Sequence, residues 1–260
     1  MSGGLNNTGV TISGLSFSYE HDRKVLNDLN LQIEPGERFG IIGPSGAGKS
    51  TLMLHLNGIL TPDEGAVKIG DIAVNRESIA QVRQRVGLVF QNPDDQLFSP
   101  TVEEDVAFGP LNMGLKQDEV QQRVAMALEE MGLTGFEDLS SHHLSYGEKK
   151  RVALATVLAM KPEVVAFDEP FSNLSPGMVE HLIDTIKELQ ATVIVVSQSI
   201  LPVIATCQRL AILREGRLVA VDTTRKIAMN RDLLRENGLD FHYYFDVLKE
   251  LEQRDRGHAD

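Results

Sequence analysis

The chain has 260 residues, of which 42% are hydrophobic and 24% are charged, as in folded proteins with one large domain or two smaller ones. Its formal net charge of −12 argues against broad electrostatic binding to nucleic acid or to an anionic lipid surface. Cys207 is the single cysteine, which excludes an intrachain disulfide and a cysteine-rich metal site. We expect it to be a small core residue in a protein of a reducing compartment.

The sequence predicts no membrane-spanning segment. Residues 1–8 lack the basic and apolar regions of a secretory signal. The longest apolar stretch, 191–207, is interrupted by polar residues and by Pro202, and it falls short of the ~20 residues that cross a bilayer. We therefore expect membrane contact only through partner subunits.

The first third of the chain reads as strands around one loop. Residues 10–19, 29–33 and 66–69 have the patterns of short strands, and they predict an antiparallel β layer. The apolar run 39–42 suits a buried strand, and residues 51–56 continue as a helix.

The segment between this strand and this helix fits the phosphate-loop pattern G-x-x-x-x-G-K-[ST]. Its glycines allow the backbone N–H groups to converge on phosphate oxygens at a positive helix N-terminus. Lys49 can reach the β- and γ-phosphates, and the Ser50 hydroxyl can bind Mg²⁺. The predicted nucleotide-binding residues here are Gly43, Pro44, Ser45, Gly46, Ala47, Gly48, Lys49, Ser50 and Thr51.

Residues 92–160 change to a helical pattern. Within this region an apolar stripe with the spacing of an amphipathic helix follows Val120, Val124, Leu128 and Met131. A buried helix over 147–160 ends before Pro162 because proline cannot continue it. We predict a helical subdomain inserted into an α/β core.

Two acidic residues, Asp168 and Glu169, end the apolar run 164–167. With 192–196 and 39–42, this run predicts parallel strands whose two faces are both covered by helices. Ligands bind at the carboxyl ends of such strands. Asp168 can hold Mg²⁺ through its water shell, and Glu169 can orient or polarise an attacking water.

Residues 144–148, Leu-Ser-Tyr-Gly-Glu, complete a resemblance to the ATP-binding cassette (ABC) ATPases, whose signature is Leu-Ser-Gly-Gly-Gln. The resemblance covers nearly the whole chain, and it implies a dimer that sandwiches two ATP molecules head to tail. Ser145, Gly147 and Glu148 would then close over the partner's nucleotide. Ser145 also reads as an N-cap that forms a capping box with Glu148. Gln91 resembles the family's glutamine that contacts Mg²⁺, and Tyr19 resembles the aromatic residue that stacks on adenine.

A narrower resemblance connects residues 91–98 and 101–106 to the cobalt/nickel and energy-coupling-factor subgroup, which energises uptake of metal ions and vitamins. The C-terminal extension is similar to that subgroup too. We predict an ABC ATPase domain over 1–222, with its helical subdomain at about 92–160. A C-terminal helical extension over 223–260 would include a helix at 241–251.

The chain departs from the family at two loops. Gln198 stands where the family has a histidine that contacts the γ-phosphate and the catalytic glutamate. Its amide can still donate a hydrogen bond but cannot carry a proton near neutral pH, so we expect a hydrolytically weakened site. Ser175 replaces an aspartate and can cap the helix that opens at Pro176. The adjacent His142 and His143 are expected to be solvent-exposed rather than metal ligands.

These resemblances imply an ATP- and Mg²⁺-dependent subunit that energises a membrane importer. It would sit peripherally on the cytoplasmic face of the membrane, docked on integral membrane subunits through residues 91–110. A second ABC ATPase subunit would complete it as a heterodimer or a homodimer. The alternatives are a soluble, non-transport ABC ATPase and a nucleotide-gated binding module with negligible turnover. We expect no nucleic-acid partner.

Overall fold

The computed structural model describes residues 8–19, 24–242 and 246. Two sheets form its core. The antiparallel sheet has the order β2-β1-β4-β5, with β1 (Val10–Ser18), β2 (Lys24–Ile33), β4 (Glu64–Ile69) and β5 (Ile72–Ala73). The expected antiparallel layer is therefore present.

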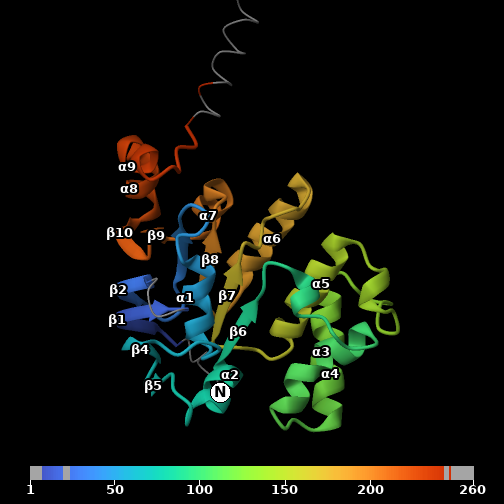
Figure 1. The fold of residues 1–260 in the computed structure, drawn as a ribbon. Helices are drawn as coiled ribbons and strands as arrows, with labels where there is room; N and C mark the ends of the chain where they lie inside the picture. The colour runs from blue at the N-terminus through green and yellow to red at the C-terminus, as the bar shows by residue number, and fades with distance from the viewer. Residues whose placement is uncertain (1–7, 20–23, 243–245, 247–260) are drawn as a thin grey trace, which may run out of the picture.

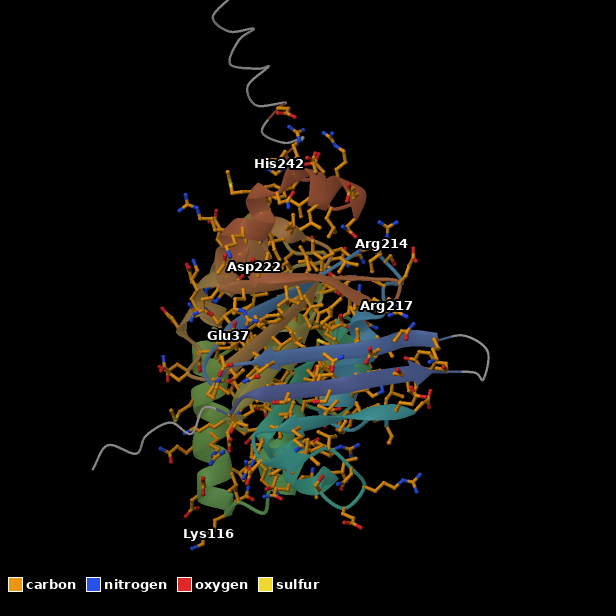
Figure 2. The ribbon with its side chains drawn as sticks, turned by 90° about the vertical axis from the view of Figure 1, so that its left-hand side faces the viewer. Glu37, Lys116, Arg214, Arg217, Asp222 and His242 are labelled. Carbon is orange, nitrogen blue, oxygen red and sulfur yellow. The ribbon has the colours of Figure 1, made fainter. Side chains whose placement is uncertain are left out.

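The second sheet has the order β10-β9-β3-β8-β7-β6. All its neighbouring strands run parallel except β9 and β10, which form a hairpin. The strands are β3 (Arg38–Ile42), β6 (Val86–Val89), β7 (Val164–Asp168), β8 (Thr192–Ser197), β9 (Arg209–Arg214) and β10 (Arg217–Thr223). Figure 2 shows Arg214 and Arg217 at one end of the hairpin and Asp222 toward the other.

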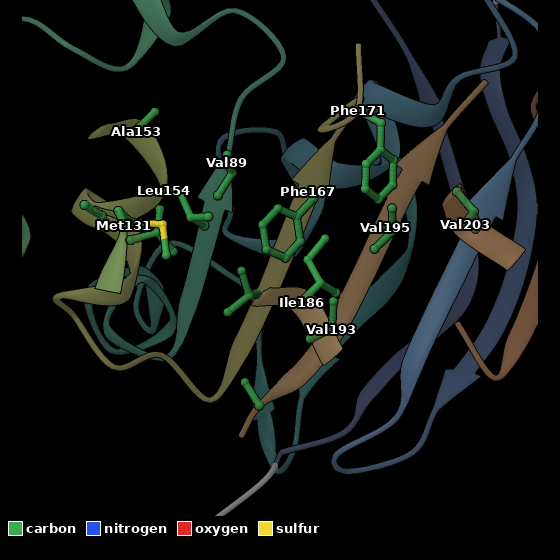
Figure 3. Packing of buried hydrophobic residues seen from close by; sticks show 14 of the residues in the cluster. Val89, Met131, Ala153, Leu154, Phe167, Phe171, Ile186, Val193, Val195 and Val203 are labelled. Carbon is green, nitrogen blue, oxygen red and sulfur yellow. The ribbon is translucent and has the colours of Figure 1, made fainter. Parts of the chain in front are cut away.

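Helices lie on both faces of the parallel sheet, as expected, and on one face the antiparallel sheet packs beside them. Along β8, Ile194 and Val196 pack in one cluster with the antiparallel sheet and with α1 (Lys49–Leu56). Val193 and Val195 pack on the opposite side with Ile186 of α6 (Pro176–Glu188), as Figure 3 shows. Because side chains alternate along a strand, an all-apolar strand reports two covered faces but not what covers each.

The helices α3 (Val102–Asn112), α4 (Gln117–Glu130) and α5 (Tyr146–Leu158) lie together on one side of the molecule, beyond β6 (Figure 1). The predicted stripe of Val120, Val124 and Leu128 is buried on α4. It belongs to the same hydrophobic cluster as the buried face of α5. This packing places the start of α5 at the surface.

Shorter elements complete the described chain. They are α2 (Ile79–Arg85), α7 (Ile200–Thr206), α8 (Thr224–Met229), α9 (Arg231–Glu236) and the 3₁₀ turns η1 (Pro93–Asp95) and η2 (Ser141–His143). Within the predicted C-terminal extension, α8 and α9 are helical, whereas most of the helix predicted at 241–251 lies outside the described residues. In the described part of the chain, no helix is both long and apolar enough to cross a bilayer.

Candidate functional site

An open cleft of about 580 Å³ lies over the loop that joins β3 to α1. Its walls come from segments far apart in the sequence that meet at the carboxyl ends of β3, β7 and β8, where α/β sheets bind ligands. The lining residues are Val25, Ser45, Gly46, Gly48, Lys49, Ser50, Thr51, Gln91, Glu169 and Gln198. All of these except Val25 are residues that the sequence analysis assigned to nucleotide binding or to catalysis.

The loop conformation depends on glycine at particular positions. Gly48, the N-cap of α1, has φ of 102°, and a Cβ there would lie 2.9 Å from the Val25 carbonyl oxygen. A Cβ on Gly43 would lie 2.1 Å from the Leu213 carbonyl oxygen. Gly46 has φ of 77°, and its missing Cβ would meet no atom within 4 Å. Glycine therefore lets the loop pack closely against neighbouring backbone while leaving space above it.

The remaining predicted loop residues shape the backbone or the rim of the cleft. The Ala47 N–H donates to the Pro44 carbonyl oxygen at 3.2 Å, and the Ala47 carbonyl accepts from the Gly216 N–H at 3.1 Å. These contacts hold the loop in a tight turn whose outer surface is formed by Ser45 and Gly46.

Lys49 is buried at the floor of this cleft. Its Nζ donates hydrogen bonds to the Gly43 and Pro44 carbonyl oxygens at 2.8 and 3.1 Å and lies 3.7 Å from Glu169 Oε1. Burial lowers the pKa of the Lys49 ammonium, while Glu169 and Asp168 partly offset that effect. The ammonium is thus held by the loop's own carbonyls at the lining of the cleft.

Asp168 lies beside Ser50 at the end of β7. Burial raises the pKa of the Asp168 carboxyl, with a further contribution from nearby Glu169, whereas the Ser50 hydroxyl and Lys49 lower it. Among the described residues, nothing donates a hydrogen bond to Asp168 Oδ1, although that atom is buried. Since buried oxygens are normally satisfied, a carboxylate oxygen without a partner next to a hydroxyl fits a small cation such as Mg²⁺, which prefers oxygen ligands.

Glu169 is held by the neighbouring strand β8. Ser197 Oγ donates to Glu169 Oε2 at 2.9 Å, and the Gln198 backbone N–H donates to Oε1 and Oε2 at 2.9 and 3.0 Å. Glu169 also has a left-handed φ of 45°, a strained conformation for this residue type that clusters at functional sites. Its carboxylate is therefore fixed at the cleft wall, close to Lys49.

The other predicted residues around the cleft take distinct places. The Gln198 side chain lines the cleft, while its backbone makes the contact with Glu169. Gln91 lines the cleft, and its backbone carbonyl oxygen accepts a hydrogen bond from the Tyr146 hydroxyl at 3.2 Å. Tyr19 is 59% exposed, and its hydroxyl shares a 3.2 Å hydrogen bond with Thr51 Oγ1. Stacking of Tyr19 on adenine stays a prediction.

Ser145, Gly147 and Glu148 are not brought to this cleft. They form the N-terminus of α5, where Ser145 and Glu148 make the expected capping box. The Ser145 N–H and Oγ donate to Glu148 Oε2 at 2.8 and 2.7 Å, and these bonds lower the pKa of the Glu148 carboxyl. The signature residues are therefore preorganised at the surface, outside the cleft of their own chain.

Two smaller expectations have different outcomes. Ser175 is the N-cap of α6, but its side chain makes no capping hydrogen bond, so the expectation of a capping hydroxyl is wrong. The first turn is closed by the backbone, where the Val179 N–H donates to the Ser175 carbonyl at 3.0 Å. His142 and His143 are exposed in η2, as expected. Within the described ranges no group of three His, Cys, Asp or Glu could hold a metal ion.

Sequence reasoning missed Ser197 and Lys150. Ser197 holds the Glu169 carboxylate, and Lys150 donates hydrogen bonds to the backbone that follows Glu169. The only signal for Ser197 was its place just before Gln198, whereas Lys150 had none beyond its position in the α5 segment.

Comparisons with known proteins agree with this geometry. Residues 26–172 match the ABC transporter family. The energy-coupling factor transporter ATP-binding protein EcfA of Methanothermobacter thermautotrophicus is 46% identical over 247 residues, which are 93% of this chain and 79% of that protein. A putative ABC transporter ATP-binding protein of Streptomyces avermitilis is 44% identical over 237 residues, which are 91% of this chain and 90% of that protein.

Solved structures give the same result. CbiO1 of Clostridium perfringens, described as part of the ABC transporter complex CbiONQ, superposes with a TM-score of 0.77 and 34% identity, covering 92% of this chain and 98% of that one. An ATP-binding cassette in a dimeric post-hydrolysis state with ADP and Pi superposes with a TM-score of 0.74 and 27% identity, covering 83% of this chain and 99% of that one. The chain therefore belongs to the ABC transporter family and has the fold of its ATP-binding, ATP-hydrolysing subunits.

Proposed function

We propose that this chain binds and hydrolyses ATP at the cleft above the phosphate loop to energise a membrane importer for metal ions or vitamins. The observation that carries the proposal is the convergence of Lys49, Ser50 and Glu169 at one cleft, with buried Asp168 close to Ser50 and Lys49. Four chemically different groups that suit a triphosphate, a cation and an attacking water lie together there. The similarity to EcfA and CbiO1 supports the transport role.

In this mechanism the backbone N–H groups of the loop bind the β-phosphate, helped by the α1 dipole. Lys49 exchanges its contacts with the Gly43 and Pro44 carbonyls for phosphate oxygens. Asp168, Ser50 and Gln91 would hold Mg²⁺, which neutralises phosphate charge when bound. Glu169, fixed by Ser197, orients the attacking water and polarises it toward the γ-phosphate.

A second ABC subunit completes the site in this proposal. Ser145 and the Gly147 N–H lie at an exposed helix N-terminus that their own chain does not use, and this terminus suits the γ-phosphate of a neighbour's ATP. Gln198 weakens the site on this chain's own loop, whereas Ser145 remains available to the partner. We therefore favour a heterodimer with one weak and one competent site over a homodimer with two slow ones.

The surface near residues 91–110 suits the integral membrane subunits. Phe98, Phe108 and Leu111 are at least half exposed there, and the two phenylalanine rings meet edge to face at 4.9 Å. Asp105, which is buried, accepts hydrogen bonds from the Phe98 and Ser99 N–H groups at 3.0 and 2.9 Å. A rigidly held, exposed aromatic pair is typical of a protein interface. Docking here would place the chain peripherally at the cytoplasmic face.

Purification of tagged chain from detergent-solubilised membranes of its own host tests the transport role. We expect integral membrane subunits to co-purify, and Phe98→Asp to remove them. Met229→Asp is a matched control, because Met229 is 74% exposed on α8, outside the proposed docking surface. Recovery of the chain with ribosomes or DNA, without membrane subunits, would favour the soluble ABC ATPase.

Gln198 favours a second candidate, a nucleotide-gated binding module with negligible turnover. Phosphate release by the wild-type chain, beside its Gln198→His variant, separates the two. We expect slow wild-type release that the histidine variant accelerates at least tenfold, since general acid–base catalysis is worth roughly 10²–10⁴. Vigorous wild-type hydrolysis that the substitution leaves unchanged would refute the weakened site. Absence of release from both proteins, with ATP bound, would favour the binding module.

A further inference from the structure

The Lys150 side chain connects α5 to the loop that follows β7. Its Nζ donates to the Ser172 and Pro170 carbonyl oxygens at 2.8 and 3.0 Å. It also lies 3.2 Å from Ser172 Oγ and 3.3 Å from the Glu169 carbonyl oxygen. One ammonium therefore contacts four oxygens of a single loop, and that loop begins at Glu169.

This loop has an unfavourable backbone without such support. Glu169 and Asn173 both have left-handed conformations, with φ of 45° and 58°, although neither is a glycine. Such conformations persist only when surrounding contacts determine them. The Glu169 carbonyl also accepts from Ser172 Oγ at 2.8 Å, so the lysine and the loop's own serine close the turn together.

The position of Lys150 is costly for a charged group. Burial lowers the pKa of its ammonium to about 8, and nearby Glu169 only partly offsets this. The Tyr146 ring lies 5.5 Å from Nζ, and Lys150 lines a small, largely apolar pocket together with Arg151 and His181. A partly desolvated cation in such surroundings is more typical of a functional role than of simple packing.

Lys150 also lies five residues after Ser145 on the same helix. A shift of α5 when Ser145 engages a partner's nucleotide would therefore move the ammonium that supports Glu169. We infer that Lys150 is a positioning residue, which holds the Glu169 loop in its hydrolytic conformation and connects it to the signature end of α5. The inference rests on the proposed role of Glu169 in hydrolysis.

The test compares Lys150→Gln, Lys150→Arg and the control Lys226→Gln in the purified full-length chain, without a partner subunit whose own site would contribute turnover. Lys226 is a matched control because it is exposed and pairs with Asp222 at 3.2 Å. We expect Lys150→Gln to lower kcat at least about tenfold, as for a displaced general base, with ATP affinity and melting temperature close to wild type. Lys150→Arg, which keeps the charge, should recover most of kcat, and Lys226→Gln should match wild type.

A second arm places Lys150→Gln in a Glu169→Gln background, with residual turnover followed over hours using radiolabelled ATP. If Lys150 acts through Glu169, Lys150→Gln should cause no further loss of turnover in the Glu169→Gln background, because the effects of substitutions at coupled residues are not additive. An equal fractional loss in both backgrounds, or a wild-type kcat for Lys150→Gln, would overturn the inference. If Lys150→Gln does not fold, Ser172→Ala, which removes the hydroxyl that contacts both Lys150 and the Glu169 carbonyl, carries the same comparison. Wild-type turnover by Glu169→Gln alone would instead refute the proposed role of Glu169.

Discussion

Alanine at Gly46 and at Gly48 should have different consequences, although both glycines lie in the phosphate loop with left-handed φ of 77° and 102°. A left-handed alanine costs about 1–2 kcal/mol relative to glycine. Alanine also restricts the unfolded chain, but this gain applies only where the native conformation is compatible with it. Gly46→Ala should therefore lower the free energy of unfolding by about 1–2 kcal/mol, since its Cβ meets no atom within 4 Å.

Gly48→Ala carries the same backbone cost and a steric one. Its Cβ would lie 2.8 Å from Leu26 Cδ2 and 2.9 Å from the Val25 carbonyl oxygen. The leucine can move, but the carbonyl belongs to strand β2. Overpacking of this kind costs about 1–3 kcal/mol, so the total loss should be about 2–5 kcal/mol.

Urea unfolding at 25 °C, followed by circular dichroism, measures both variants against wild type. Equal losses for the two, or a Gly48→Ala protein within about 0.5 kcal/mol of wild type, would refute the close approach of loop and strand. ATP titration adds an independent readout. The methyl group of Gly46→Ala points into the open cleft. This variant should therefore bind ATP more weakly than wild type, although it loses less stability than Gly48→Ala.

Three further predictions concern single side chains. Replacing Asp168 by asparagine should raise the unfolding free energy of the nucleotide-free chain at pH 7 and weaken Mg²⁺-dependent ATP binding. The sign follows because the pKa of the Asp168 carboxyl is raised in the folded state, so the ionised carboxylate costs stability at pH values above its unfolded-state pKa of 3.8. An Asp168→Asn protein with the urea unfolding of wild type would contradict this prediction. Glu148→Gln should strengthen ATP-dependent dimerisation in sedimentation, since it removes a negative charge from the exposed α5 terminus, and unchanged or weaker dimerisation would argue against phosphate binding there. Burial raises the pKa of the Cys207 thiol to about 12, so a thiol reagent at pH 8 should label it only after denaturation, and rapid labelling of the folded chain would show that the site is open.

The local elements of the fold could be predicted from the sequence because their signals are local. Short apolar runs mark the parallel strands, and the glycine pattern marks the loop before α1. Ser145 and Glu148 mark the start of α5, since a capping box involves residues only three positions apart. The side chains of Lys49, Asp168 and Glu169 were assigned on the same basis, because each belongs to a short motif of neighbouring residues.

Contacts between distant segments could not be predicted in this way. Ser197 and Lys150 act on Glu169 from β8 and α5, at separations of 28 and 19 residues, and nothing in the local pattern of either residue indicates that contact. The packing of the antiparallel sheet on one face of the parallel sheet was not predicted, for the same reason. Ser175 is the converse case. Its residue type and its position predict a capping side chain, but the backbone closes the first turn of α6 instead.

A structure of the chain with Mg²⁺ and a slowly hydrolysed ATP analogue would show where the triphosphate and the ion bind. We expect the phosphates to lie against the N–H groups of the loop, and Lys49 Nζ to leave the Gly43 and Pro44 carbonyls for phosphate oxygens. We also expect the ion within about 2.0–2.1 Å of Ser50 Oγ, as octahedral Mg²⁺ requires. A nucleotide bound elsewhere, with Lys49 still on those carbonyls, would contradict these expectations.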